Sequence, residues 1–181
     1  MGYGYLNPKQ REALAQHVRG RHMTDYGCGD MALACDMLAM GAEHVLCIDK
    51  TQVHRKPPHV GITFRHGYFH EIDGTYPHLF LSWPVNYLQV EIVKAAVTAE
   101  TVVYLGKNTD GSACGTPDLF EVLVRREILA YVPDRINTLI IYGSFIAEPN
   151  EAHREPMPEE QAGLTSHVGE ILAYESIEHG C

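Results

Sequence analysis

The sequence predicts an α/β fold in which helices cover both faces of a mostly parallel β-sheet. Apolar runs of strand length alternate with segments of helical periodicity along most of the chain. The connections between them are short, which favours parallel pairing through helical crossovers. Glycines such as Gly20 and Gly41 stand where two of the predicted helices end.

The first half of the chain predicts two helices and four strands. A helix is expected over residues 7–19, because Asn7 can cap it, Pro8 suits its first turn and Gly20 suits its end. The other elements expected here are a strand at 22–26, a largely buried helix at 30–40, and strands at 44–49, 60–66 and 77–82.

The second half predicts two further helices and up to three strands. Thr116 can cap a helix that begins at Pro117 and continues to about Val132, and Arg125 and Arg126 on it are expected to be solvated. The other expected elements are a helix at 87–100, a strand at 101–105, a glycine-rich loop at 106–116, a strand at 136–142, a loop at 148–166 and a final strand at 170–177.

The charge of the chain is uneven. Fourteen Lys and Arg residues against 23 Asp and Glu residues give a formal net charge of -9, which argues against broad binding of nucleic acid through phosphates. However, residues 147–181 hold eight of the acids and one arginine. The total charge is therefore weak evidence about the substrate.

Composition also sets expectations about compartment and metal binding. There is no apolar run of transmembrane length, and the N-terminus lacks the apolar run of a signal peptide. The five cysteines are odd in number and form no CxxC pair, which favours reduced thiols over a disulfide framework or a zinc site. His66 and His70 are interpreted as solvated loop residues. We therefore expect one cytoplasmic domain over residues 1–181, without a membrane partner or a metal.

A glycine turn after the first predicted strand carries the functional prediction. Gly27 and Gly29 let the backbone approach a ligand closely, and the following helix offers its free N–H groups. Asp49 ends the next strand, roughly 20 residues after Gly27, where an acid can accept the hydroxyls of an adenosine ribose. This βαβ unit fits a cofactor that contains adenosine.

Two cofactors compete for this turn. Gly27, Gly29 and Ala32 satisfy the glycine pattern of nicotinamide dinucleotide enzymes, so an NAD-dependent oxidoreductase is one alternative. Asp25 precedes the turn and would repel a pyrophosphate. S-adenosylmethionine has no phosphate and carries a sulfonium and an ammonium group, which a carboxylate attracts. The sequence from Asp25 to Gly29 therefore favours S-adenosylmethionine.

With these residues the chain resembles the class I (Rossmann-like) S-adenosylmethionine-dependent methyltransferases. The resemblance implies a three-layer sandwich with a mostly parallel seven-stranded sheet and an antiparallel C-terminal hairpin, which residues 136–143 and 170–177 would supply. It also implies that residues 1–21 supply a helix and a lid over the cofactor. Met31 departs from the family pattern, because a third glycine normally stands there.

The resemblance also implies the site residues. The expected cofactor-binding residues are Asp25, Gly27, Cys28, Gly29, Asp49, Lys50, Gly67, Tyr68 and Ser82. Trp83 and Tyr87, after the fourth predicted strand, would wall the methyl-transfer pocket, and Asn86 could hold the nucleophile. The expected activity is in-line methyl transfer to a small molecule, with protein as the next choice and nucleic acid as the last. A non-catalytic binding module is a further alternative.

Overall fold

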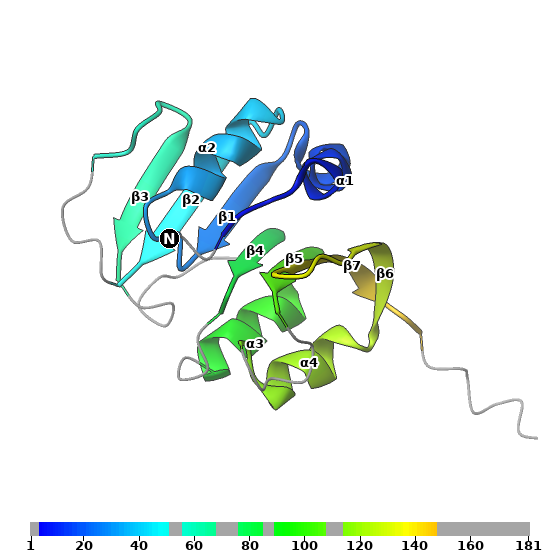
Figure 1. Cartoon of the computed structure of the whole chain (residues 1–181). Helices are drawn as coiled ribbons and strands as arrows, with labels where there is room; N and C mark the ends of the chain where they lie inside the picture. Colours follow the sequence, from blue (N-terminus) through cyan, green and yellow to red (C-terminus); the bar gives the residue numbers. More distant parts are fainter. Residues whose placement is uncertain (1–3, 51–55, 68–75, 85–88, 108–113, 148–181) are drawn as a thin grey trace, which may run out of the picture. The chain divides into compact units, whose positions relative to one another are not determined.

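The computed structural model describes residues 4–50, 56–67, 76–84, 89–107 and 114–147 (Figure 1). Its helices are α1 (Pro8–Val18), α2 (Ala32–Ala39), α3 (Gln89–Thr98) and α4 (Pro117–Leu123). Its strands are β1 (His22–Tyr26), β2 (His44–Asp49), β3 (Ile62–His66), β4 (His78–Ser82), β5 (Thr101–Gly106), β6 (Arg126–Val132) and β7 (Thr138–Phe145). All of these elements belong to one compact unit that ends at Ile146.

Seven strands form one sheet in the order β3-β2-β1-β4-β5-β7-β6. The five strands from β3 to β5 are parallel, whereas β7 runs antiparallel to both β5 and β6. This confirms the predicted mostly parallel sheet with an antiparallel hairpin. The order also reverses at β1, because β2 and β4 lie on opposite sides of it, and ligands bind at such a point in open α/β sheets.

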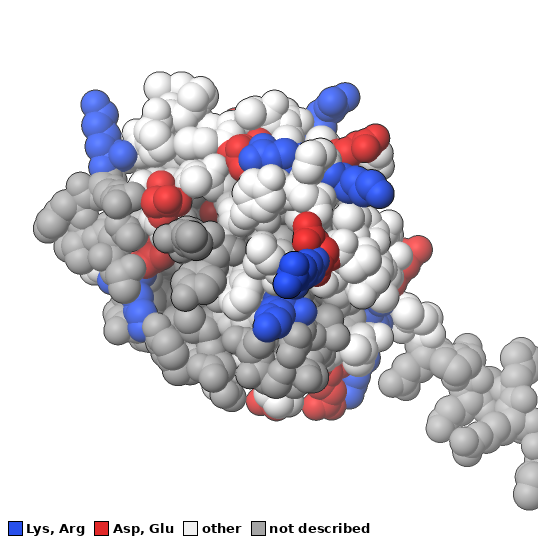
Figure 2. All heavy atoms as spheres, viewed as in Figure 1, with Lys and Arg blue, Asp and Glu red and all other residues white. Residues whose placement is uncertain are grey.

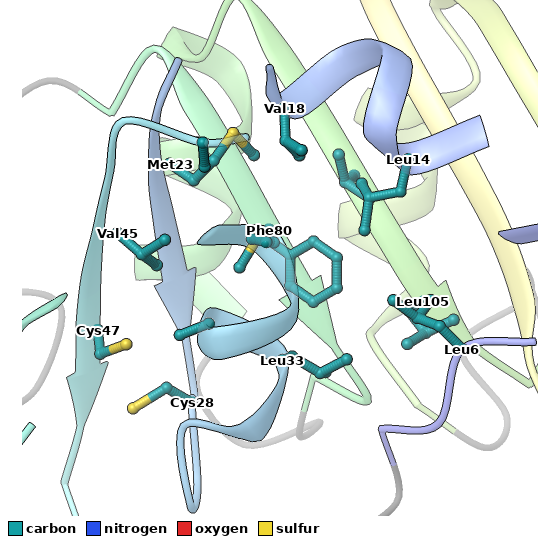
Figure 3. Close-up of a cluster of buried hydrophobic side chains, with 14 of the residues drawn as sticks. Leu6, Leu14, Val18, Met23, Cys28, Leu33, Val45, Cys47, Phe80 and Leu105 are labelled. Atoms are coloured by element: carbon teal, nitrogen blue, oxygen red, sulfur yellow. The ribbon is translucent and has the colours of Figure 1, made fainter. Parts of the chain in front are cut away.

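Two apolar cores give the three layers. One core joins α1 and α2 to the first face of the sheet, and Figure 3 shows Leu14, Val18 and Leu33 in it together with Phe80 of β4. The second core joins α3 and α4 to the opposite face through Ile92, Phe120 and their neighbours. Alternate residues of the central strands contribute to the two cores, so both faces of these strands are buried, as parallel sheets require.

The start of α1 forms as its sequence predicts. The side chain of Asn7 accepts the Gln10 N–H at 2.9 Å, and the Gln10 side chain accepts the Asn7 N–H at 3.0 Å. This capping box satisfies backbone donors that the first turn of a helix leaves free, and Pro8 needs no partner there.

The helix predicted from Pro117 to Val132 is wrong in its second half. Helix α4 ends at Leu123, and the chain turns through Val124 into β6, which pairs with β7. The strand predicted at residues 136–143 is present as β7, but its hairpin partner is β6 and not residues 170–177, which lie outside the described residues. Pairing with β7 outweighs the local preference for a longer helix.

Arg126 fixes the start of β6, and the prediction that it is solvated is also wrong. It is 2% exposed. Its guanidinium donates to the carbonyls of Ala96 and Gly143, at 2.6 Å each, and of Ala99, at 2.7 Å. The carbonyls of Ala96 and Ala99 lie at the C-terminal end of α3, where helix carbonyls lack partners within the helix. Arg126 thus closes α3 and anchors β6 with one side chain.

We expect Arg126→Met to lower the free energy of unfolding by about 3–5 kcal/mol, because several buried carbonyl groups would lose their donor. Arg125→Met is the matched control, since the Arg125 side chain is 63% exposed and pairs with Glu121 on the surface. The control should cost less than about 0.5 kcal/mol. Urea unfolding of the three proteins measures both values, and equal small losses would contradict the role of Arg126.

Candidate functional site

The turn between β1 and α2 has the left-handed backbone that its glycines permit. Gly27 has φ 76° and Gly29 has φ 52°, both in the region that favours glycine. A Cβ atom on either residue would meet no atom within 4 Å, so the backbone conformation and not crowding requires glycine. The space beside the turn is open to a ligand.

Met31 takes the place of the third glycine and still adopts a left-handed conformation, with φ 64°. Such a backbone costs a residue with a side chain about 1–2 kcal/mol. The Met31 side chain is 1% exposed in the core under α1 and α2, and its N–H donates to the Cys28 carbonyl at 2.8 Å. Burial of the side chain offsets the strain, so the turn keeps its course without this glycine.

Asp49 ties the end of β2 to the glycine turn. Its Oδ2 atom accepts the Gly29 N–H at 3.0 Å, and the neighbouring Ile48 carbonyl accepts the Gly27 N–H at 2.8 Å. The acid that was predicted at the end of the second strand therefore lies directly beside the glycines, although nearly two dozen positions separate it from them.

Asp25 is a buried acid near the end of β1, just before the glycine turn. Strand register places it between Cys47 of β2 and Phe80 of β4, both completely buried, and it is itself 1% exposed. Neither carboxylate oxygen has a hydrogen-bond partner among the described residues. Burial, together with the nearby charges of Asp49 and Asp30, raises the pKa of Asp25 to about 7. A carboxylate in this position needs a proton or a cationic partner.

A cavity of about 390 Å³ opens beside this turn. Its lining consists of Gly4, Asp25, Gly27, Cys28, Gly29, Asp30, Ala32, Leu33, Ser82 and Trp83. We call it the acidic cavity, because two aspartates and no lysine, arginine or histidine are among these residues. Six of the predicted site residues thus meet at one place, from the carboxyl ends of β1 and β4.

The N-terminal segment Gly4–Leu6 forms one side of the acidic cavity. A Cβ atom on Gly4 would lie 2.5 Å from Leu33 Cδ1 and 3.2 Å from Ser82 Oγ, so the segment packs closely on α2 and β4. Leu6 is buried in the core beside α1, near Leu105 in Figure 3. A side chain at Gly4 would therefore have to displace the end of the Leu33 side chain.

Trp83 also lines the acidic cavity, directly after β4. Its backbone is left-handed, with φ 47°, and its N–H donates to the Leu105 carbonyl at 2.8 Å. The indole Nε1–H donates to Asn137 Oδ1 at 2.6 Å. Sequence reasoning missed Asn137. The available indication was that an antiparallel last strand begins at the edge where β5 ends, and Asn137 directly precedes β7.

The other predicted residues lie elsewhere or outside the described chain. Gly67 donates its N–H to the Asp49 carbonyl at 3.3 Å, and the His66 ring bonds the Lys50 carbonyl at 2.9 Å. Lys50 and Gly67 thus lie near Asp49 but do not line the acidic cavity. The remaining three, which are not described, are Tyr68, Asn86 and Tyr87.

The described ranges show neither a metal-binding cluster nor a membrane-spanning helix. They contain no group of three or more His, Cys, Asp or Glu residues placed to hold a metal ion. Within the same ranges, no helix is long and apolar enough to cross a membrane.

The raised pKa of Asp25 predicts how stability depends on pH in the absence of ligand. In the unfolded chain Asp25 titrates near 3.8, and in the folded protein near 7. Between these values the folded state binds the extra proton, so the free energy of unfolding falls as pH rises from about 4 to about 7. Asp25→Asn removes this titration and should lessen the fall by on the order of 3 kcal/mol.

Urea unfolding at several pH values between 4 and 8 checks this expectation. Glu127→Gln is the control, because Glu127 is an exposed acid on β6, and its pH profile should match that of the wild type. Parallel profiles for the wild type and Asp25→Asn would show that burial does not raise the pKa of Asp25.

Comparison with known proteins supports the fold. No protein-family model matches the chain, and no curated protein matches its sequence. The fold is similar to that of a ribosomal protein L11 methylase from Lactobacillus delbrueckii subsp. bulgaricus, with TM-score 0.55, 14% identity, and coverage of 76% of this chain and 79% of that one.

Two further structures are similar. An S-adenosylmethionine-dependent methyltransferase from Mesorhizobium loti matches with TM-score 0.54 and 12% identity, over 79% of this chain and 100% of that one. The N-terminal domain of EvdMO1 with SAH bound matches with TM-score 0.50 and 12% identity, over 78% and 82%. The chain therefore has the fold of the class I S-adenosylmethionine-dependent methyltransferases.

Proposed function

We propose that the protein binds S-adenosylmethionine in the acidic cavity and transfers its methyl group to an acceptor. The observation that carries this proposal is the buried carboxylate of Asp25, which lines the cavity and has no hydrogen-bond partner among the described residues. A ligand with a sulfonium and an ammonium group supplies the positive charge that this carboxylate lacks. The similarity to methyltransferase structures supports the same choice of cofactor.

The start of α2 supports this choice over a dinucleotide. In dinucleotide enzymes the pyrophosphate lies at the N-terminus of the helix after the glycine turn. Here Asp30 Oδ1 accepts the N–H of Ala32, the first residue of α2, at 3.1 Å. A pyrophosphate would meet the carboxylates of Asp30 and Asp25 at this position, and like charges repel.

We assign roles to the site residues on the same basis. The acidic cavity falls within the size range of small-molecule sites, and Gly27 and Gly29 allow a ligand to approach the backbone. Asp49, held by the Gly29 N–H, is proposed to accept the ribose hydroxyls. The proposal extends to Lys50 and Gly67 beside it, with Tyr68 next in the sequence, as the adenosine end of the site.

When bound, the cofactor supplies a methyl group on a positively charged sulfur that leaves readily. Much of the catalysis can then come from holding the acceptor in line with the methyl carbon. Trp83 borders the cavity with an aromatic ring, which suits a cation and limits access of water. Asn86 and Tyr87, shortly after Trp83 in the sequence, are proposed to complete the acceptor site.

The acceptor is proposed to be a small molecule, and neutral or cationic compounds suit the acidic cavity best. Nucleic acid is less suitable, because its phosphates would face Asp25 and Asp30 at the cavity. On the face shown in Figure 2, basic and acidic side chains are interspersed, without an extended basic field. Protein acceptors are the second choice.

Calorimetry with S-adenosylmethionine, S-adenosylhomocysteine and NAD⁺ tests the proposed cofactor. We expect the first two to bind and NAD⁺ to show no heat of binding. Binding of NAD⁺ alone would instead support an oxidoreductase. No binding of any of the three would reject both enzyme classes, and binding without turnover across an acceptor panel would indicate a binding module.

A second expectation concerns how affinity depends on pH. Because the pKa of Asp25 is raised to about 7, its carboxylate gains charge between pH 6 and pH 8, and affinity for S-adenosylmethionine should rise over this interval. Asp25→Asn should weaken binding at pH 8 about tenfold or more, and its affinity should change less with pH. Calorimetry at pH 6, 7 and 8 measures both. Identical pH profiles would exclude Asp25 as the partner of the cation.

A further inference from the structure

We propose that Asn137 is a positioning residue that fixes two sides of the acidic cavity at once, the Trp83 indole and the N-terminal segment. Its Oδ1 atom accepts the Trp83 Nε1–H at 2.6 Å, and its Nδ2 group donates to the Tyr5 carbonyl at 3.0 Å. Asn137 is 3% exposed, so water competes little for these bonds. The importance of the cavity for the cofactor rests on the proposed function.

A third contact joins α1 to the same residue. The main-chain carbonyl of Asn137 accepts the Gln10 Nε2–H at 2.8 Å, and Gln10 also forms the capping box with Asn7. Gln10 is buried as well. The start of α1, the residue after β4 and the N-terminal segment are therefore all linked to Asn137, although α1 and the N-terminal segment lie far from it in the sequence.

The left-handed backbone of Trp83 has to be held in place by contacts with other residues. A left-handed conformation costs a tryptophan about 1–2 kcal/mol, so neighbouring contacts must hold it. The main chain is held on both sides, because Trp83 N–H donates to Leu105 and the Pro84 carbonyl accepts the Gly115 N–H at 2.6 Å. The orientation of the indole ring is set in turn by its bond to Asn137.

Coupling between the two sides follows from this geometry. Gly4 and Trp83 both line the acidic cavity, and each is within one residue of a group that bonds to the Asn137 side chain. A ligand in the cavity therefore lies beside two lining residues, Gly4 and Trp83, whose placement depends in part on one side-chain amide. Removing the amide takes one hydrogen bond from each, which should lower affinity for the cofactor and shift the ring beside the reacting methyl group.

The fluorescence of Trp83 tests the positioning role without any ligand, because the chain has only one tryptophan. Asn137→Ala should shift the emission to longer wavelength and increase quenching by acrylamide severalfold, since the indole loses its hydrogen bond to Asn137. Asn137→Asp retains an acceptor for the indole and should keep emission near that of the wild type. Ile136→Ala is the control, because Ile136 is exposed and adjacent.

Calorimetry with S-adenosylhomocysteine supplies the second measurement. We expect about tenfold weaker binding for both Asn137→Ala and Asn137→Asp, because both lose the donor to the Tyr5 carbonyl, and less than twofold change for Ile136→Ala. Should Asn137→Ala fail to fold, as judged by circular dichroism, Asn137→Asp tests the bond to the Tyr5 carbonyl by calorimetry, and a shift of its emission to longer wavelength would contradict the role of Oδ1 as the acceptor of the indole.

The outcomes separate this inference from the proposed function. Unchanged fluorescence in folded Asn137→Ala would overturn the positioning of Trp83. If the wild type binds S-adenosylhomocysteine and the Asn137 variants bind it equally well, the inference fails while the proposed function stands. A wild type that binds none of this ligand would overturn the proposed function and the role of Asn137 in cofactor binding, whereas its hold on Trp83 would still be decided by fluorescence.

Discussion

The reversal of strand order at β1 is the constraint from which the candidate site arises. Because β2 and β4 lie on opposite sides of β1, the crossovers that leave β1 and β4 go to opposite faces of the sheet. Neither helix covers the edge where both strands end. The acidic cavity lies there, and its residues come from the end of β1, the start of α2 and the end of β4.

The central position of β1 also explains why an ionised Asp25 destabilises the folded protein. A residue on the central strand has a neighbour on each side, and for Asp25 these are the buried Cys47 and Phe80. An ionised carboxylate there has lost its water without gaining a partner, which raises its pKa. A ligand that supplies positive charge to this position would stabilise the folded state by binding to it. The burial of one carboxylate therefore accounts both for its raised pKa and for the proposed preference for a cationic cofactor.

The parallel part of the fold could be predicted from the sequence because its determinants are local. Asn7 and Pro8 mark α1, and the glycine turn and Asp49 mark the βαβ unit that contains the site. The hairpin could not be located, because the segment after Pro117 lacks a glycine or proline where α4 ends. What ends it is the distant pairing of β6 with β7 and the bonds of Arg126 to the end of α3.

The candidate site likewise has residues that local sequence spacing predicts and residues that it does not. Asp25, Gly27 and Gly29 are close in sequence, so their meeting at one turn was predictable from spacing. Asn137 bonds partners more than 50 positions away, at Trp83 and Tyr5, and a single asparagine before an apolar strand has many ordinary explanations. Long-range polar contacts of this kind leave no periodicity in the sequence.

Two residues near the acidic cavity have a strained, left-handed backbone, and different contacts hold them in place. Within the described ranges, the residues other than glycine with positive φ are Met31 and Trp83. Trp83 lines the cavity, and Met31 lies in the sequence between the lining residues Asp30 and Ala32. Met31 is held by burial of its side chain in the core, which a ligand does not alter. Trp83 is only partly buried, and a hydrogen bond to Asn137 holds its ring. The strain at Met31 thus depends on local apolar packing, whereas the position of Trp83 also depends on a polar contact with a residue 54 positions away, so a substitution at Asn137 should disturb Trp83 and leave the glycine turn unchanged.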